Sequence, residues 1–302
     1  MSTGINYLDE VWNPVSGCQG KGCKCHCWAR DMVKRFPQIH GWDPDTEDGH
    51  VRGYSPLEFS KVQFHPDRLD KPLHWKKPRR IGVSFMGDLF DEQVSFEWVA
   101  EVLCIIKSCP HHQFFILTKQ PKRMAEFFDN CGTWEGWITH NGHPNAAYGG
   151  DGIVVGFEFA IQRYRKENKK RLWPLPNVYL GVSITDQEDA DRMIPELLRI
   201  PGKHWVSYEP MLGGVNFLFC PFCQRHCLGC DADLGMPDWI VCGCESGPKR
   251  RPTNPDWFRS ARDQCKAAGV KLWIKQMEIN GKVTGDVNLF PEDLRIREWE
   301  KP

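Results

Sequence analysis

Short runs of β-branched and aromatic residues recur along this chain, and turn residues and helix-like stretches follow most of them. Parallel strands need such crossovers, because each new strand must start from the same edge of the sheet. The alternation therefore predicts an α/β fold with a parallel sheet. We expect strands at 9–14, 60–64, 80–85, 113–118, 177–184, 204–209, 238–243 and 271–276. A count of eight suggests a (β/α) barrel, partial or full.

Three helices have clear boundaries in the sequence. One begins at Ser95, and another runs from residue 185 or 186 to 200. The third has Asn254 as its N-cap, proline at its first position and Gly269 as its stop, which is the usual placement of these residue types. These helices fall between predicted strands, as a barrel requires.

The 302 residues are 41% hydrophobic, which is enough for a single large domain over 1–302. Two segments break the rhythm of strands and helices and are read as insertions, one basic and aromatic at 132–172 and one rich in cysteine at 219–236. No apolar run approaches the roughly 20 residues of a membrane helix, and the first ten residues do not resemble a signal peptide. We expect a cytoplasmic protein without membrane contact.

Charged and polar residues follow most of the predicted strands. The active site of a parallel barrel lies at the carboxyl ends of its strands, so these positions are the candidates for chemistry. They are Asp88, Lys119, Thr185, Asp186, Glu209, Glu245, Lys275 and Gln276. Any one of them could be a surface residue or part of an ordinary ion pair. Because several strand ends behave alike, the pattern indicates a charged cavity.

Four of the 14 cysteines lie within SGCQGKGCKCHCWAR, directly after the first strand: Cys18, Cys23, Cys25 and Cys27. In a reducing compartment such clusters bind metal or do redox chemistry more often than they form disulfides. The stretch has no C-x-x-C pair, so it is not typical of zinc. Three thiolates on a tight loop suit a [4Fe–4S] cluster whose fourth iron is open to a small molecule.

A second group, CPFCQRHCLGC, contains two C-x-x-C pairs made by Cys220, Cys223, Cys227 and Cys230. Four thiolates at these spacings predict zinc, with His226 as a substitute ligand, or an auxiliary iron–sulfur cluster. The spacing favours structural zinc.

Several motifs, in order, resemble one known family. They are WNPVSGC…GC…CWARDM, FHPDRLDKPLHWKKPRRIGVSFMGDLF, FILTKQPKRM, WPLPNVYLGVSITDQEDADRMIPELL, VSYEPMLGGV, DWIVCGCESGPKRRPTNPDWFRSARDQCKAAGV and WIKQM, spread over 11–277. Together they resemble the phage-associated three-cysteine-motif family of radical-SAM-like proteins. The resemblance implies a [4Fe–4S] cluster, bound S-adenosylmethionine, an external electron donor and a 5′-deoxyadenosyl radical that abstracts hydrogen from the substrate.

The resemblance assigns Cys18, Cys23 and Cys27 to the cluster. The family usually separates its last two cysteines by two residues, whereas this chain offers a gap of three from Cys23 or of one from Cys25. Cys25 therefore stays a rival ligand to Cys23.

The other matching positions are expected to bind the cofactor or substrate. Asp88 is the candidate for the amino group of S-adenosylmethionine, because a carboxylate accepts from an ammonium group, and Ser183 for its ribose or carboxylate. The remaining matches are Lys119, Asp186, Glu209, Glu245, Lys275 and Gln276. Glu209 and Lys275 are the expected catalytic side chains. Cys244 is a third, as a hydrogen-atom donor to a substrate radical if it faces the cavity.

Three basic runs and 13 tryptophans bear on the substrate. The runs are WKKPRR at 75–80, RYRKENKKR at 163–171 and KRRP at 249–252, in a chain whose net charge is zero. Cationic grooves with aromatic faces suit nucleic acid or nucleosides, although such runs are equally often solvated surface. The phage association favours modification of a base, by analogy with the family.

Two other classes of protein remain open at this stage. The first is a zinc-stabilised nucleic-acid-binding protein in which both cysteine groups are structural. The second is a barrel hydrolase or nuclease that uses Asp88, Glu209 and Glu245 around a hard metal ion.

Overall fold

An eight-stranded sheet carries the fold, in the order β1-β4-β5-β6-β7-β8-β9-β10. The computed structural model describes residues 5–24, 26–41, 57–129, 173–217, 235–247 and 249–299. Neighbouring strands in this order are parallel except for β9 and β10. The predicted α/β class with a mostly parallel sheet is therefore confirmed.

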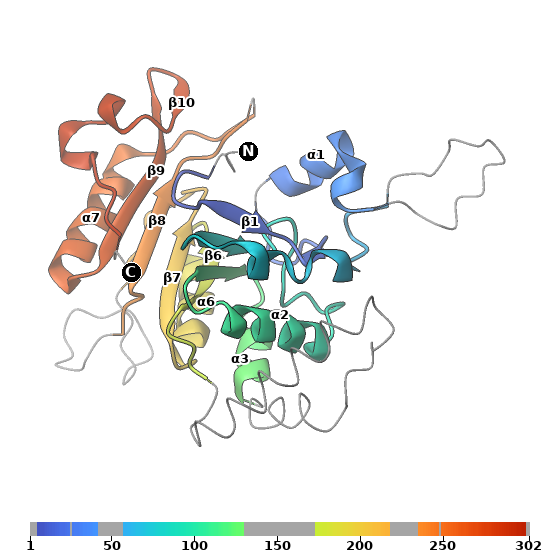
Figure 1. Ribbon diagram of the computed structural model, residues 1–302. Helices are drawn as coiled ribbons and strands as arrows, with labels where there is room; N and C mark the ends of the chain where they lie inside the picture. The colour runs from blue at the N-terminus through green and yellow to red at the C-terminus, as the bar shows by residue number, and fades with distance from the viewer. Residues whose placement is uncertain are drawn as a thin grey trace.

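The sheet consists of β1 Glu10–Trp12, β4 Arg80–Val83, β5 Gln113–Thr118, β6 Val178–Ile184, β7 Lys203–Tyr208, β8 Trp239–Gly243, β9 Lys271–Ile279 and β10 Lys282–Thr284. It is curled but open, with β1 at one edge and β10 at the other (Figure 1). The architecture is thus a half-barrel, the partial form of the predicted barrel.

One predicted strand is wrong as a member of this sheet. In the segment 60–64 only β3, Gln63–Phe64, is extended, and it pairs antiparallel with β2, Val15–Ser16. The eighth strand of the sheet is instead β10, which follows β9 through a tight turn. Asn280 and Gly281 form that turn with positive φ of 49° and 73°, as a two-residue hairpin requires.

The helices are α1 Trp28–Arg35, α2 Phe96–Ser108, α3 Pro121–Asp129, α6 Gln187–Leu198 and α7 Pro255–Ala268. Short 3₁₀ segments lie at Pro37–Ile39, Pro66–Arg68, Lys71–His74, Val287–Leu289 and Glu292–Leu294. The predicted caps are confirmed, since Ser95, Asp186 and Asn254 each accept a hydrogen bond from the first turn of their helix. None of the described helices is both long and apolar enough to cross a membrane.

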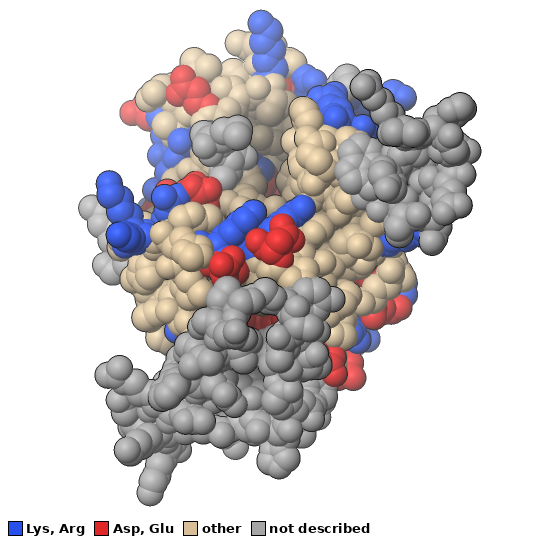
Figure 2. All heavy atoms as spheres, turned by 45° about the vertical axis from the view of Figure 1, so that its right-hand side comes forward, with Lys and Arg blue, Asp and Glu red and all other residues tan. Residues whose placement is uncertain are grey.

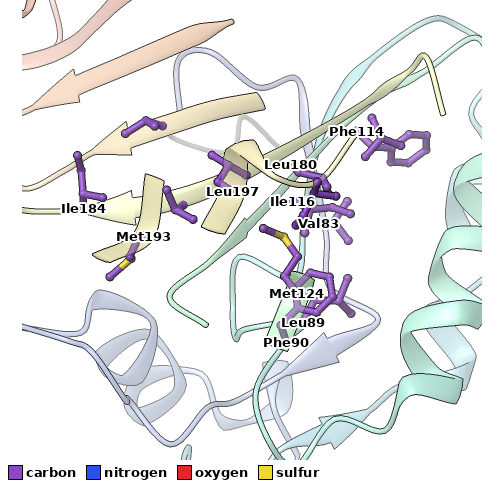
Figure 3. Packing of buried hydrophobic residues seen from close by; sticks show 14 of the residues in the cluster. Val83, Leu89, Phe90, Phe114, Ile116, Met124, Leu180, Ile184, Met193 and Leu197 are labelled. Atoms are coloured by element: carbon purple, nitrogen blue, oxygen red, sulfur yellow. The ribbon is translucent and has the colours of Figure 1, made fainter. Parts of the chain in front are cut away.

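Two apolar cores lie on the two faces of the sheet. The larger one joins the sheet to α2, α3, α6 and α7, and Figure 3 shows Val83, Ile116 and Leu180 of neighbouring strands beside Met124 of α3. The smaller one fills the concave face with aromatic rings, among them Trp205 and Trp239. Because both faces are filled, the free edge at the carboxyl ends of the strands is where a site can form.

Candidate functional site

The segment 16–27, here called the cysteine loop, begins at the end of β2 and leads into α1. Gly17, Gly20 and Gly22 have positive φ of 85°, 75° and 77°, which L side chains rarely adopt. A side chain at Gly17 would also come within 2.7 Å of the His40 ring and 2.8 Å of the Phe59 carbonyl oxygen. The glycine spacing of the sequence thus sets the tight path of the loop.

Three successive backbone N–H groups hold the start of the cysteine loop against the sheet. Gly17 donates to the Met86 carbonyl at 2.8 Å and Cys18 to the Phe59 carbonyl at 3.0 Å. The N–H of Gln19 donates to Oδ2 of Asp91 at 2.9 Å. The thiol of Cys18 is therefore presented from a fixed backbone at the carboxyl end of β4.

The three predicted cluster thiols lie in this loop and sense one another. Burial, followed by the charges of Asp88, Cys27 and Cys23, raises the pKa of Cys18 to about 12. Cys23 is exposed, and the sulfur of Cys27 caps α1 by accepting from the N–H of Arg30 at 3.5 Å. Cys25 lies outside the described residues. The loop brings together the predicted set, and the choice between Cys23 and Cys25 stays a prediction.

The chemistry of these donors decides which metal group fits. A single zinc ion needs thiolate sulfurs about 2.3 Å away, and within the described ranges no three His, Cys, Asp or Glu side chains gather in that way. A four-iron cluster is larger and binds each thiolate at a different iron atom. Three thiols from one glycine-rich loop at the sheet edge fit this second arrangement. The group formed by Cys220, Cys223, Cys227 and Cys230 lies outside the described residues.

Asp88 is buried and its carboxylate is already bonded within the protein. Oδ1 accepts from the N–H of Phe90 at 2.9 Å and from the hydroxyl of Thr118 at 2.7 Å, and Oδ2 accepts from the N–H of Lys119 at 2.9 Å. Burial raises the pKa of Asp88, although these hydrogen bonds oppose the shift. The side chain ties the turn after β4 to the end of β5, which is a different task from the predicted contact with an amino group.

Lys119 and Ser183 meet at the ends of β5 and β6. The ammonium Nζ of Lys119 donates to Oγ of Ser183 at 3.0 Å and to its carbonyl oxygen at 3.3 Å. Within the described part of the chain this half-buried cation has no ion pair with a carboxylate. An ammonium has three donors, so Lys119 retains capacity for an anion.

Lys24 joins the cysteine loop to the amino end of α6. Its Nζ lies 2.9 Å from Asp186, 2.7 Å from Glu188 and 3.5 Å from Asp189. Burial alone would raise the pKa of Asp189, but hydrogen bonds from Thr185 and Arg192 and the charge of Lys24 lower it. Asp186, predicted to bind the cofactor, thus caps a helix and binds the loop.

Glu245 forms a bidentate ion pair with Arg251 after β8. Two guanidinium nitrogens lie 2.9 and 2.6 Å from the carboxylate oxygens, and this pairing lowers the pKa of Glu245. Arg251 also donates to the carbonyl of Lys24 at 3.2 Å. Figure 2 shows how Lys and Arg side chains lie directly beside Asp and Glu side chains across this kind of surface.

Glu209 and Lys275 form an ion pair at the ends of β7 and β9. Oε1 of Glu209 lies 2.9 Å from Nζ of Lys275, and both side chains are mostly buried. Gly243 makes room for the pair, since a Cβ there would lie 2.3 Å from the same oxygen. The register places Cys242 opposite Ile274 and Gly243 opposite Gln276, so Lys275 is the extra residue of a β-bulge.

The bulge also places Gln276. Its Nε2 donates to the carbonyl of Cys244 at 2.7 Å, and its own carbonyl accepts from the N–H of Cys244 at 3.2 Å. Cys244 is only 2% exposed, and burial raises the pKa of its thiol to about 11. Gln276 therefore supports the backbone at Cys244, and the role of this thiol as a hydrogen-atom donor stays a prediction.

The basic runs do not all lie at this edge. The run at 75–80 precedes β4 and so lies at the amino ends of the strands, where Arg79 pairs with Glu10 and Arg80 with Asp9. The run at 249–252 lies at the site, but Arg250 and Arg251 are paired with Glu278 and Glu245. The run at 163–171 and the insertion at 132–172 lie outside the described residues.

Sequence reasoning missed the residues that organise the cysteine loop, chiefly Asp91, Lys24 and Arg251. Lys24 was visible between two cysteines, but its partners lie more than 160 positions away. A signal existed for Asp91, which lies in the same GDLFD stretch as Asp88.

Fold and site together define an α/β half-barrel protein with a thiol-bearing loop at the carboxyl edge of its sheet. The profile of a family described as "Protein of unknown function (DUF5131)" matches residues 2–287, so the chain belongs to that family. Searches of curated proteins and of solved structures each returned no match.

Proposed function

We propose that this protein is a radical S-adenosylmethionine enzyme that acts on a base in nucleic acid or in a nucleoside. The observation that carries the proposal is the cysteine loop: Cys18, Cys23 and Cys27 lie at the carboxyl edge of an open parallel sheet. When bound there, a [4Fe–4S] cluster and S-adenosylmethionine supply reductive cleavage to methionine and a 5′-deoxyadenosyl radical that removes a hydrogen atom from the substrate.

The residues of this chain would bind and orient those groups. The three thiols hold the cluster, and the Asp91 and Lys24 contacts keep the loop in place. Lys119 and Ser183 are the best-placed groups for the carboxylate of S-adenosylmethionine, because the ammonium has no carboxylate partner among the described residues. Asp88 contributes by fixing β4 to β5.

The second pair of side chains, Glu209 and Lys275, would face the substrate. Their burial excludes water around a carboxylate and an ammonium that lie 2.9 Å apart. In such surroundings both charges act more strongly on a neighbouring polar group than they do in bulk water. Removal or delivery of a proton by Glu209, with Lys275 holding its charge, is the catalytic task this geometry supports.

The proposal includes a cytoplasmic location and an external electron donor, since free thiols and a reducible cluster both need a reducing compartment. The hydrolase alternative is less well supported. Its three carboxylates, Asp88, Glu209 and Glu245, do not form a metal-binding group among the described residues, and each is bonded elsewhere.

Anaerobic reconstitution with iron and sulfide tests the proposal. We expect a brown protein that binds about four iron atoms and releases 5′-deoxyadenosine from S-adenosylmethionine when dithionite is added. Separate Cys18→Ala, Cys23→Ala and Cys27→Ala variants should lose the colour, whereas Cys104→Ala, in the buried face of α2, should keep it. A colourless protein that holds only zinc after the same treatment would support the zinc-stabilised binding protein instead.

A further inference from the structure

The concave face of the sheet is packed in layers. Inward-facing residues alternate along each strand, and the lower layers are filled by rings such as Phe115, Tyr179, Trp205 and Trp239, each no more than 2% exposed. Glycine makes this density possible, because a Cβ at Gly181 would lie 2.3 Å from the Trp205 ring nitrogen. These layers form a closed apolar base.

Phe85 and Leu117 form the uppermost part of that base. Both pack against the aromatic cluster but remain only half-buried, unlike the rings beneath them. The Phe85 ring lies nearly parallel to Trp205, with 13° between the planes and 6.4 Å between centroids. Part of a flat apolar surface is therefore left uncovered on the concave side.

An unusual backbone turn puts Phe85 in this position. Ser84 has a φ of 56°, in the left-handed region that a serine seldom occupies, and its buried hydroxyl has no hydrogen-bond partner. The turn directs Phe85 back over Gly82, where a Cβ would lie 3.1 Å from the ring. Strained residues of this kind occur preferentially at binding and catalytic sites.

Polar groups lie one layer above this apolar surface. Lys119, Ser183 and Lys275 each follow an inward-facing residue by two positions, namely Leu117, Gly181 and Trp273. Two residues of strand span about 6.6 Å, which leaves room for one planar ring in van der Waals contact below the ammonium groups. An apolar floor below a few polar groups is the usual composition of a small-molecule site.

We propose that Phe85 and Leu117 are the floor of a site for a planar nucleobase ring whose anionic tail reaches Lys119. The inference rests on the proposed function and adds the residues that hold the ring. The shared chemistry is a nucleobase with a carboxylate or phosphate, which both S-adenosylmethionine and a nucleotide substrate possess. Stacking on Phe85 accepts any base, while Lys119 supplies the charge complement.

The test compares two variants that differ only in place. Phe85→Leu keeps an apolar side chain but removes the ring, and Phe64→Leu is its matched control. Phe64 is also half-buried and lies 5.0 Å from and parallel to a tryptophan, Trp98, but belongs to the core shared with the helices. Calorimetry on the full chain would use S-adenosylhomocysteine as one probe and a short single-stranded DNA oligonucleotide as the other.

We expect Phe85→Leu to weaken binding of at least one probe by about fivefold to a hundredfold, the range that corresponds to stacking of one base. Phe85→Tyr should restore it, and Phe64→Leu should leave it unchanged. Loss with S-adenosylhomocysteine assigns the floor to adenine of the cofactor, and loss with the oligonucleotide assigns it to a substrate base.

Three results would overturn the inference: neither probe binds the unaltered protein, Phe85→Leu binds as tightly as that protein, or Phe64→Leu loses as much affinity. The proposed function fails separately, through absence of an iron–sulfur cluster and of 5′-deoxyadenosine. Ring binding that depends on Phe85 in a protein without a cluster would thus retain the site and remove the radical chemistry.

Discussion

Nζ of Lys24, in the cysteine loop, lies 2.9 Å from Oδ1 of Asp186, which caps α6. The contact joins segments that are 162 positions apart. Because Glu188 and Asp189 share the same ammonium, one lysine holds three carboxylates at the place where the loop crosses the sheet edge. The position of the thiols therefore depends on charges outside the cysteine motif.

Replacement of Lys24 by glutamine should loosen this loop. The change removes the cation that compensates Asp189, which is fully buried, and we expect a loss of about 1 kcal/mol in unfolding free energy. Cys18 should become several times more reactive towards iodoacetamide, as measured by mass spectrometry of its peptide. Lys21→Gln is the matched control, since Lys21 pairs only with the exposed Glu92 in the described structure. Equal labelling of Cys18 in both variants would show that Lys24 does not position the loop.

Replacement of Asp88 by asparagine separates a structural from a ligand-binding role. An amide cannot accept hydrogen bonds with both of its polar atoms, so at least one of the donors Phe90, Thr118 and Lys119 loses its acceptor. An unsatisfied buried donor costs about 1–3 kcal/mol, which lowers the Tm by a few degrees. The measurement is thermal unfolding without ligand.

An unchanged Tm for Asp88→Asn, with weaker binding of S-adenosylmethionine, would restore the role that the sequence predicts for this carboxylate. Asp67→Asn is a suitable control, because Asp67 is exposed and its ion-pair distance to Arg68 is 3.9 Å.

Much of the fold was predictable because its signals are local. The apolar runs of β5 and β6 and the caps at Ser95 and Asn254 needed no knowledge of distant residues. The strand at 60–64 was wrong because a short extended segment gives the same pattern in a small hairpin as in a large sheet. The β10 hairpin carried a signal, Asn280-Gly281, that points to a two-residue turn.

The site was predictable in membership but not in pairing. Strand-end positions indicate which residues meet at the edge, and Lys119 and Ser183 do meet. That Glu209 would select Lys275 depends on a β-bulge in β9 and on Gly243, and a bulge shifts side-chain direction without leaving a mark in residue type. Long-range ion pairs such as that of Lys24 leave no local signal either.

Replacement of Ser84 by glycine should stabilise the protein. Glycine adopts a positive φ without the steric cost that serine meets, and the unpartnered hydroxyl disappears. The expected gain is about 1 kcal/mol, or a Tm higher by about 2 °C. Ser60→Gly serves as the control, because Ser60 is exposed and its hydroxyl donates to Glu58 at 3.2 Å. A lower Tm for Ser84→Gly, like that expected for the control, would mean that the turn is not strained.

A buried chain of hydrogen bonds behind the cysteine loop should make stability depend on pH. His40 Nε2 donates to the Glu58 carbonyl at 3.0 Å, so its Nδ1 is the acceptor for the hydroxyl of Ser16 at 2.8 Å. That leaves Ser16 to accept from Nε2 of His65 at 2.7 Å. The chain therefore requires both imidazoles to be neutral.

Burial, followed by the positive charge of Arg68, lowers the pKa of His65 to about 4, and burial also lowers the pKa of His40. Lys71 adds to the effect on His65, and Asp67 opposes it. In the unfolded chain a histidine titrates near about 6.5. As the pH falls from that value towards 4, the unfolded state binds protons that the folded state does not, so stability should decrease through this window.

His65→Gln should reduce that dependence. The glutamine amide can still donate to Ser16 but does not titrate, so the urea midpoint should fall less between about pH 7.5 and about pH 5 than it does in the unaltered protein. His74→Gln is the control, since His74 is exposed and bonded to Asp70 at 3.0 Å. If His65→Gln keeps the full pH dependence, the charge that destabilises the folded state enters elsewhere than in the chain that supports the cysteine loop.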